Sequence, residues 1–343
     1  MTEVRITPYQ PEMAASVMAL MGNQSRKSHI WNWQFHDNPY ARNFDPVVAC
    51  LGGEVVGFNG VMPVRLSVNG QECEALWSCD FYVDSKVRGQ GVGRLIKDAL
   101  HERSDRIMAL GVSEKAAAVL AHIGWKEVPC MHIMHRIYRV GSWRDLILHG
   151  FQWINRLKGG PGPARGRVVR LETLPETGVL EMLWQAMAGN STVVQVVRSP
   201  AYLNWKYAQH PLARYQSYLY EAPDGQPGGL LIVREKPDAL IVVDYSGRHD
   251  AGIKAALLEA VTRRGRLNRQ HIVLATSDAQ FVSVARGMGF YRGRYASRFF
   301  VYQKGESPAA LADATWFLMA GDSDGELLAA TRDALNEEDS VHG

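Results

Sequence analysis

Apolar and polar residues alternate in short segments over the first 140 residues, and the segments between them place apolar residues three or four positions apart. The first pattern predicts strands and the second predicts helices. Strands are predicted at residues 4–6, 47–51, 55–61, 64–68, 72–83, 107–112 and 131–140. Helices are predicted at residues 11–21, 28–36, 91–103 and 114–122. This order indicates an α/β unit, in which helices flank a mixed, mostly antiparallel sheet.

An amphipathic helix is predicted over residues 141–158, and a linker rich in Gly and Pro follows at residues 159–166. One stripe of this helix carries large apolar side chains, namely Trp143, Ile147, Phe151 and Ile154. We expect the stripe to pack between two domains that form one rigid body, because a solvated connector would leave these side chains in water. We do not expect the helix to lie on a membrane surface.

The residues after the linker repeat features of the first unit. Trp205 precedes Pro211 at the distance at which Trp33 precedes Pro39. Residues 272–275 and 289–290 match residues 107–110 and 124–125 at one constant offset. We therefore predict two tandem domains, at residues 1–140 and 168–320, joined by the helix and linker at 141–167, and a disordered tail at 321–343.

Three glycines lie where a predicted strand passes into a predicted helix. The stretch Arg88-Gly-Gln-Gly-Val-Gly93 follows the apolar run at 77–83 and precedes the helical pattern. Backbone N–H groups at such a turn form an anion site, and glycine lets a phosphate approach them closely. No Gly-Lys-Ser/Thr follows, and the glycine spacing is not Gly-x-Gly-x-x-Gly. A nucleoside-triphosphate loop and a dinucleotide-binding turn are therefore both excluded.

This turn resembles the acetyl-CoA signature of the GNAT (general-control-type) N-acetyltransferase superfamily. A second stretch, Ser113-x-x-Ala116-x-x-x-Leu120-x-x-x-Gly124-Trp125, is similar to that family's Asn-x-x-Ala-x-x-x-Tyr-x-x-x-Gly-Phe segment. The resemblance covers residues 1–140, and the rest of the chain resembles a degraded second copy. In that copy residues 245–252 hold two glycines, and Asp250 would repel a pyrophosphate.

The resemblance implies that acetyl-CoA, or another acyl-CoA, binds along the strand and the glycine turn as co-substrate. The implied ligands are Phe81, Tyr82, Val83, Arg88, Gly89, Gln90, Gly91, Val92, Gly93, Arg94, Ser113 and Ala116. No metal site is expected, because the histidines are scattered and the tail sequence 321–326 lacks a calcium-loop pattern, so we interpret it as a turn.

Asp80 is our first candidate for the general base. It is the one carboxylate in the apolar run at 77–83 before the turn, among apolar neighbours that favour a raised pKa. A structural role for Asp80 and a proton path through water stay open. Leu120 occupies the position at which the family usually has its acid, a tyrosine, so either another group is the acid or the leaving thiol needs none. The candidates for the acid are Ser113, Tyr82, His132 and His135.

Trp31 is expected to contact the acceptor, because it has no aromatic counterpart in the second copy, whereas Trp33 is repeated as Trp205. Asp80 and His132 are the other predicted acceptor contacts. Trp and Tyr faces suit amino sugars or aromatic amines, and the sequence does not choose among acceptors.

Composition narrows the function. A net charge of +3 without a long basic run argues against nucleic acid as the main partner. Four cysteines without Cys-x-x-Cys spacing indicate free thiols in a reducing compartment, and no secretory signal or membrane-spanning run is visible, so we expect a cytoplasmic protein. We predict an acyl-CoA-dependent N-acyltransferase in which an amino sugar or another small primary amine attacks the thioester directly in a ternary complex. A Fem-type peptidyl transferase and a non-catalytic CoA-binding regulator or scaffold are the alternatives.

Overall fold

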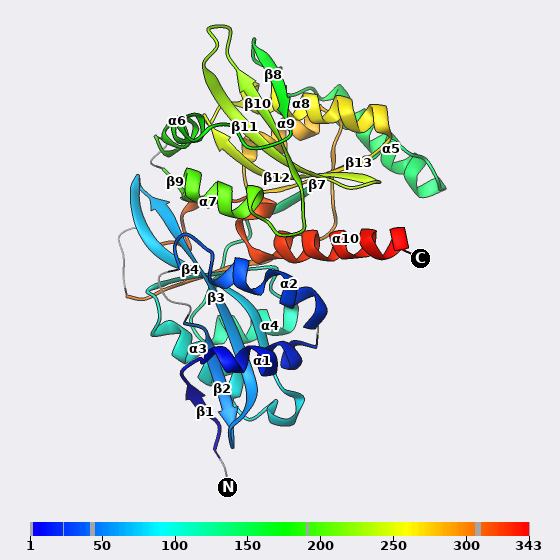
Figure 1. Ribbon diagram of the computed structural model, residues 1–343. Coiled ribbons are helices and arrows are strands. Elements are labelled where there is room, and N and C mark those ends of the chain that lie inside the picture. The colour runs from blue at the N-terminus through cyan, green and yellow to red at the C-terminus, as the bar shows by residue number, and fades with distance from the viewer. Residues whose placement is uncertain (1–2, 23, 42–44, 190–191, 306–309, 343) are drawn as a thin grey trace.

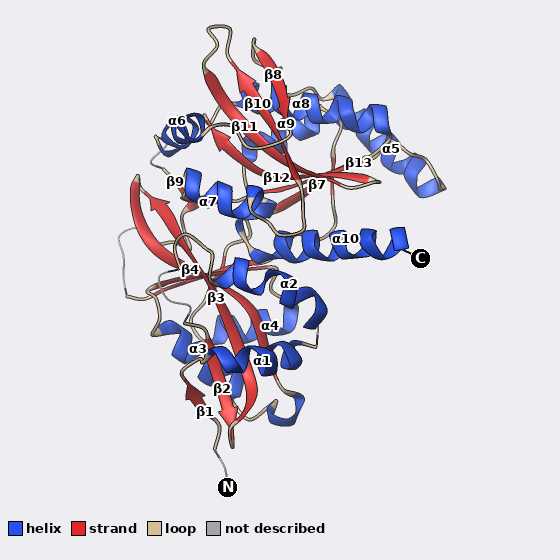
Figure 2. Ribbon diagram, in the orientation of Figure 1, coloured by secondary structure: helices blue, strands red, loops and turns tan. Residues whose placement is uncertain are grey.

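Two mixed sheets form the two halves of the computed structural model, which describes residues 3–22, 24–41, 45–189, 192–305 and 310–342 (Figures 1 and 2). The first sheet has the order β1-β2-β3-β4-β5-β15-β6, and β9 and β16 extend it beside β3. Its strands are β1 (Arg5–Thr7), β2 (Val47–Leu51), β3 (Glu54–Val68), β4 (Gln71–Val83), β5 (Arg106–Leu110), β15 (Phe299–Gln303), β6 (Lys126–Glu127), β9 (Val193–Val196) and β16 (Thr315–Phe317). The helices of this half are η1 (Pro11–Met13), α1 (Ala14–Met21), α2 (Gln24–Phe35), η2 (Ser85–Val87), α3 (Val92–His101) and α4 (Glu114–His122).

The second sheet has the order β14-β7-β13-β12-β11-β10-β8. Its strands are β14 (Tyr291–Arg292), β7 (His132–Arg136), β13 (His271–Thr276), β12 (Ala239–Gly247), β11 (Pro227–Glu235), β10 (Tyr215–Glu221) and β8 (Arg167–Leu171). The helices of this half are α5 (Trp143–Leu157), α6 (Thr177–Ala188), α7 (Pro200–Leu203), the π-helical turn η3 (Asn204–Ala208), α8 (Ala251–Asn268), α9 (Ala279–Gly287), η4 (Ala320–Asp322) and α10 (Asp324–His342). The predicted fold class, two α/β units with mixed sheets, is confirmed.

The two halves exchange strands: one strand of the N-terminal half lies in the second sheet, and three strands of the C-terminal half, β9, β15 and β16, lie in the first. β7 comes from the N-terminal half but pairs with β13 and β14 of the second sheet. In return, β15 comes from the C-terminal half but pairs with β5 and β6 of the first sheet. The expectation that residues 131–140 complete the first unit is therefore wrong. Alternating apolar and polar residues predict that a segment is a strand and which of its faces is buried, but they do not predict which other strand it pairs with.

The repeated tryptophans meet at the junction of the halves. Trp33 and Trp205 stack with their rings 5.2 Å apart. The Trp33 indole donates to the Trp205 carbonyl at 2.9 Å, and the Trp205 indole donates to the Trp33 carbonyl at 2.8 Å. This reciprocal pair has the form of a self-complementary dimer contact built within one chain. Together with a buried cluster shared by both halves, it supports the expectation of one rigid body.

Two expectations about helices are wrong. The tail forms α10, which packs on α2 instead of being disordered. The apolar stripe of α5 faces solvent, because the helix is held by its polar side: Gln152 bonds both backbone groups of Ile137, and Asn155 donates to the Phe290 carbonyl. The periodicity that we used to predict burial therefore identifies an amphipathic helix without identifying which side of it packs.

Candidate active site

Asp80 lies in a bulge of the long β3–β4 hairpin. The pairing shifts register between Phe58, opposite Tyr82, and Gly60, opposite Cys79. Asp80 has a φ of 49°, which is uncommon for a residue other than glycine. A bulge bends its strand and re-aims a side chain, and such bulges are frequent beside active sites. The backbone of the bulge is accordingly released from the regular ladder.

A cavity of about 430 Å³ separates β4 from β5 beyond their last paired residues. The two parallel strands pair only at Leu76 with Ile107 and at Trp77 with Met108. Residues 78–82 then line one side of the cavity and residues 109–113 line the other. Helices α3, α4 and α10 complete its wall with Lys97, Ala116, Val119, Leu120, Asp324, Gly325 and Leu328.

A smaller cavity of about 220 Å³ lies on the other side of Asp80. The two cavities share Asp80, Tyr82, Gly325 and Leu328. The remaining wall of the smaller cavity comes from α1, α2 and α10 through Met21, Lys27, Ala329 and Arg332. Asp80 and Tyr82 therefore lie at the boundary between the two cavities, where their side chains could contact one molecule in each.

Three charged side chains meet at this boundary. Asp80 pairs with the Lys27 ammonium at 2.5 Å, and both side chains are almost fully buried. Cys79, Asp80 and Asp324 have donor atoms that all lie within 4.8 Å of one another. Burial, and then the neighbouring Asp80 carboxylate, raise the pKa of Asp324 to about 7. Asp324 can therefore accept a proton near neutral pH.

Asp324 belongs to a segment that is anchored on both sides. The Arg198 guanidinium pairs with Asp322 at 2.8 Å, and the Arg234 guanidinium pairs with Glu326 at 2.5 Å. Both pairs are buried, so they fix the start of α10 and leave the acid between them at the cavity wall. We interpreted residues 321–326 as a turn, and the alternating acids were the signal that could have identified Asp324.

The same three residues are, within the described part of the chain, a group close enough to share a metal ion. The charges around these residues disfavour a bound metal ion. The Lys27 ammonium already neutralises Asp80 and would repel a cation. Burial, followed by the Asp80 charge, raises the pKa of Cys79, so its thiol stays protonated.

Lys97 is buried in the wall of the larger cavity. Its ammonium donates to Asn59 Oδ1 at 2.7 Å and to Ser78 Oγ at 2.9 Å, and lies 4.4 Å from the centre of the Phe81 ring. Burial lowers the pKa of Lys97 to about 7. Near neutral pH this lysine can therefore both hold and release a proton. Sequence reasoning missed it because it occupies an ordinary position of an amphipathic helix.

The glycine turn has the expected form. Gly89 and Gly91 both have φ of 81°, and a Cβ at either would point into open space. Gly91 caps α3, whose first N–H groups lack partners within the helix. The Gln90 N–H donates to the Val87 carbonyl, and the Arg88 side chain donates to the Val83 carbonyl, so these two groups are engaged within the turn.

Other predicted residues are divided between the cavity and elsewhere. Tyr82 lines both cavities, and Ser113 lines the larger one while its Oγ accepts the Ala116 N–H at the start of α4. Trp31 is a core residue, packed 4.9 Å from the Phe35 ring. His132 lies in β7, opposite Thr276 in the second sheet, and lines neither cavity. The strand exchange removes His132 from the first sheet.

The corresponding turn of the second half is filled by the chain itself. Asp250 caps α8 by accepting the Ile253 N–H at 2.9 Å. The linker residue Ala164 donates its N–H to the Gly252 carbonyl, and its backbone lies 3.2 Å from where a Gly252 Cβ would be. A carboxylate and a linker thus occupy the space that a phosphate would need.

No known protein-family model and no curated protein sequence matches the chain. Solved structures do match. A GCN5-related N-acetyltransferase from Anabaena variabilis has a TM-score of 0.62 at 13% identity, over 87% of this chain and 72% of that one. A tandem GNAT protein from the clavulanic acid biosynthesis pathway has a TM-score of 0.52 at 17% identity, over 89% of this chain and 100% of that one. Saccharomyces cerevisiae N-myristoyltransferase with bound myristoyl-CoA has a TM-score of 0.54 at 10% identity, over 90% of this chain and 84% of that one. The chain therefore shares the fold of these solved structures, which is the fold that the resemblance of the glycine turn implies.

Proposed function

We propose that this protein is an acyl-CoA-dependent N-acyltransferase that moves an acetyl group from acetyl-CoA to a primary amine, an amino sugar or another small amine. The observation that carries the proposal is the continuity of the site. The larger cavity opens between β4 and β5 in the half that holds the glycine turn, and it ends at Asp80 and Asp324, beyond which the smaller cavity begins. The turn suits a pyrophosphate, the larger cavity suits the pantetheine and acyl group, and the smaller one suits an amine.

In this proposal Asp324 is the general base. The acceptor ammonium gives a proton to Asp324, and its nitrogen attacks the thioester carbonyl. Asp80 is the less suitable base, because its carboxylate is ion-paired with Lys27, and its charge serves to keep the pKa of Asp324 high. The backbone of the bulge lies at the cavity and offers hydrogen-bond donors to the oxyanion.

The leaving thiolate needs a proton when the C–S bond breaks. We assign this task to Lys97 and to the Ser78 hydroxyl that accepts its hydrogen bond, because both line the larger cavity. Leu120, which also lines this cavity, cannot donate a proton. The products are the amide and the free thiol of CoA. The acceptor ammonium loses two protons, one to Asp324 before the attack and one as the amide forms. Sulfur gains one proton from Lys97, so each turnover releases one proton to solvent. Tyr82 contacts both substrates, and Ser113 and Ala116 border the acyl-CoA.

Thiol release from acetyl-CoA over a panel of amines tests the proposal, with myristoyl-CoA as a second donor. Asp324→Asn should lower turnover by about two to four orders of magnitude while CoA binds as before. Asp313→Asn, an exposed acid outside both cavities, is the matched control. CoA binding without turnover for any amine would favour the regulator or scaffold, and turnover that requires aminoacyl-tRNA would favour the peptidyl transferase.

A further inference from the structure

Helix α5 exposes an unusually large apolar face. Trp143 and Trp153 are about two thirds exposed, at 66% and 65%, and Phe151 is 54% exposed. The other members of this face are Leu146, Ile147, Ile154 and Leu157, which are also exposed. At 100° per residue, these seven side chains span roughly 160° of the helix circumference. A surface helix normally buries such a face, so a partner outside the described chain is implied.

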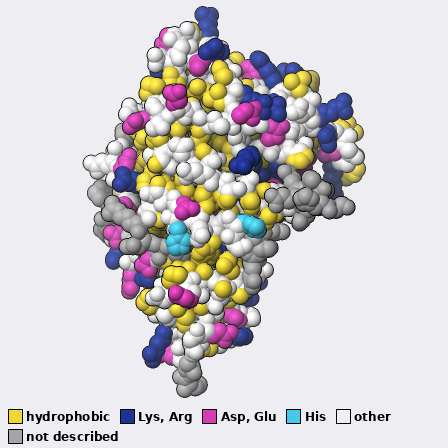
Figure 3. Space-filling model, viewed as in Figure 1, with side chains coloured by type: hydrophobic (Ala, Val, Ile, Leu, Met, Phe, Trp, Pro, Cys, Tyr) yellow, Lys and Arg dark blue, Asp and Glu magenta, His cyan; other side chains and the backbone are white. Residues whose placement is uncertain are grey.

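The rim of this face is basic. Residues 139–158 contain Arg139, Arg144, Arg156 and Lys158 against one acid, Asp145. The Asp145 carboxylate is already used in the cap of α5, where it accepts the N–H groups of Gly141 and Ser142. In Figure 3 hydrophobic and basic side chains lie together at the edge of the molecule from which α5 projects.

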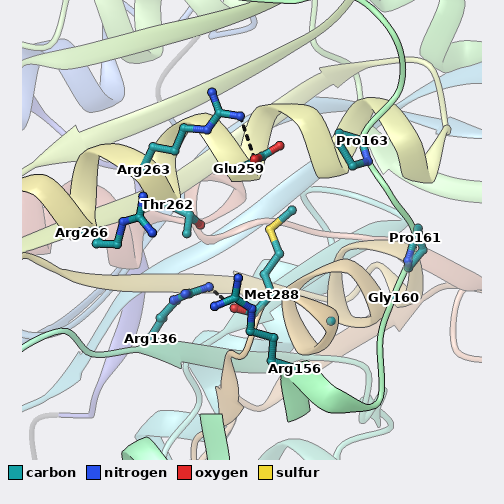
Figure 4. A pocket seen from close by; sticks show the side chains of 11 residues that line it. Arg136, Arg156, Gly160, Pro161, Pro163, Glu259, Thr262, Arg263, Arg266 and Met288 are labelled. Carbon is teal, nitrogen blue, oxygen red and sulfur yellow. Dashed lines mark hydrogen bonds and ion pairs between the residues drawn. The ribbon is translucent and has the colours of Figure 1, made fainter. Parts of the chain in front are cut away.

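An arginine-lined cavity of about 310 Å³ adjoins the C-terminal end of α5. Figure 4 shows Arg136 from β7, Arg156 from α5 and two arginines of α8, Arg263 and Arg266, around this space. Arg263 pairs with Glu259 at 2.8 Å. Within the part of the chain that the structure describes, the other three lie within ion-pair distance of no carboxylate. Three positive charges thus face one space with little compensation, and they call for an anion.

These two features together assign a partner. We propose that α5 lies in the interface of an anionic phospholipid bilayer, with its tryptophans and aliphatic side chains among the acyl chains and a lipid phosphate in the arginine-lined cavity. Trp153 and Arg156 are three residues apart, so the apolar face and the cavity are neighbours on the helix surface. An amphipathic helix with Trp, Leu and Ile on one side and basic residues at its rim has the composition of an interfacial helix.

A second copy of the chain fits this surface less well. A two-fold contact through α5 would bring the basic rim against the same basic rim, and the one acid of the segment is occupied by the helix cap. An anionic membrane complements the rim instead. Among the described residues, no helix has the length and hydropathy needed to cross a bilayer, so the contact would be at the surface. Our earlier expectation against membrane contact depended on the stripe being buried.

The full-length protein should co-sediment with vesicles containing roughly one third phosphatidylglycerol in phosphatidylcholine, and much less with phosphatidylcholine alone. Ile147→Glu with Phe151→Glu should abolish sedimentation, whereas Met182→Glu, an equally exposed apolar position on α6, should leave it unchanged. Arg144→Gln and Arg266→Gln should each weaken binding about fivefold, the loss expected for one charge near the surface.

Two results would overturn the proposal. One is that wild-type protein stays in the supernatant with the phosphatidylglycerol vesicles. The other is a concentration-dependent dimer, seen by light scattering, that Ile147→Glu with Phe151→Glu dissociates, because the face would then belong to a second copy. Acyltransferase turnover in the absence of vesicles is measured beside both, so that failure of this proposal is distinguishable from failure of the enzymatic one.

Discussion

Replacing Lys97 with methionine tests whether burial lowers the pKa of this lysine. Burial lowers the pKa of Lys97 to about 7 in the folded protein, from 10.5 for an exposed lysine. Between these pH values the unfolded chain holds a proton that the folded chain has released, so stability rises with pH. The slope is about 1.4 kcal/mol per pH unit, which amounts to about 5 kcal/mol over the whole window.

Methionine has a similar length but no charge, so the difference in unfolding free energy between wild type and Lys97→Met isolates this slope. The variant also loses the hydrogen bonds to Asn59 and Ser78, which shifts the difference by a nearly constant amount. The wild type should therefore lose stability relative to the variant as the pH falls from 10.5 toward 7, and the difference should level off below 7.

Urea unfolding, followed by tryptophan fluorescence between about pH 6 and pH 10, gives the difference at each pH. Lys86→Met is the control, because the Lys86 ammonium is exposed and its pKa is raised by the hydrogen bond to Glu54. Its stability difference should not change with pH in this range. If the difference for Lys97→Met were as flat as that for Lys86→Met, the reasoning about a lysine that titrates near neutrality would be refuted.

Three further predictions concern the site and the assembly. Gly91→Glu should weaken CoA binding by at least about tenfold in calorimetric titration, because the new carboxylate repels the pyrophosphate and the positive φ strains the backbone. Gly225→Glu, which has a similar φ in a remote turn, should not weaken it. Equal CoA affinities of the two variants would show that the pyrophosphate does not bind at this turn. Asp80→Asn should move the acidic limb of the pH–rate profile to lower pH, because the Asp80 charge raises the pKa of Asp324; an unmoved limb would mean that Asp324 is not the titrating base. Protease cleavage within residues 159–166 should leave the halves associated in gel filtration, because β7 and β15 each lie in the other half's sheet; separate elution would contradict the exchange.

The glycine turn, the hairpin and the repeat could be predicted from the sequence because each depends on neighbouring residues. Asn69 and Gly70 connect the strands predicted at 64–68 and 72–83, and both have the positive φ that a tight Asn-Gly hairpin turn requires. Gly89 and Gly91 also have the backbone that their spacing predicts. Trp33 and Trp205 were matched by spacing alone, although their mutual contact was not predicted.

The rest of the site depends on contacts between distant parts of the chain. Asp324 meets Asp80 because α10 returns across the first half. The alternating acids around Asp324 mark it as unusual, but they do not indicate that it lies beside Asp80. His132 was placed beside the site because strand pairing was assumed to follow chain order. The side on which α5 packs is decided by Gln152 and Asn155, which a hydrophobic pattern ignores. Trp31 carries no signal that separates a core aromatic from one that contacts a ligand.

The exchanged strands also set the order in which the protein can mature during synthesis. β5 emerges from the ribosome long before β15, which lies between β5 and β6 in the finished sheet. Until residues 299–303 are made, the first sheet has an open edge at β5 and β6 has no strand beside it. Domains of a multidomain chain usually fold one after another as they are made. Here the first sheet cannot be completed until nearly the whole polypeptide is made, so translation and release, more than the local folding rate, determine when the candidate site can form.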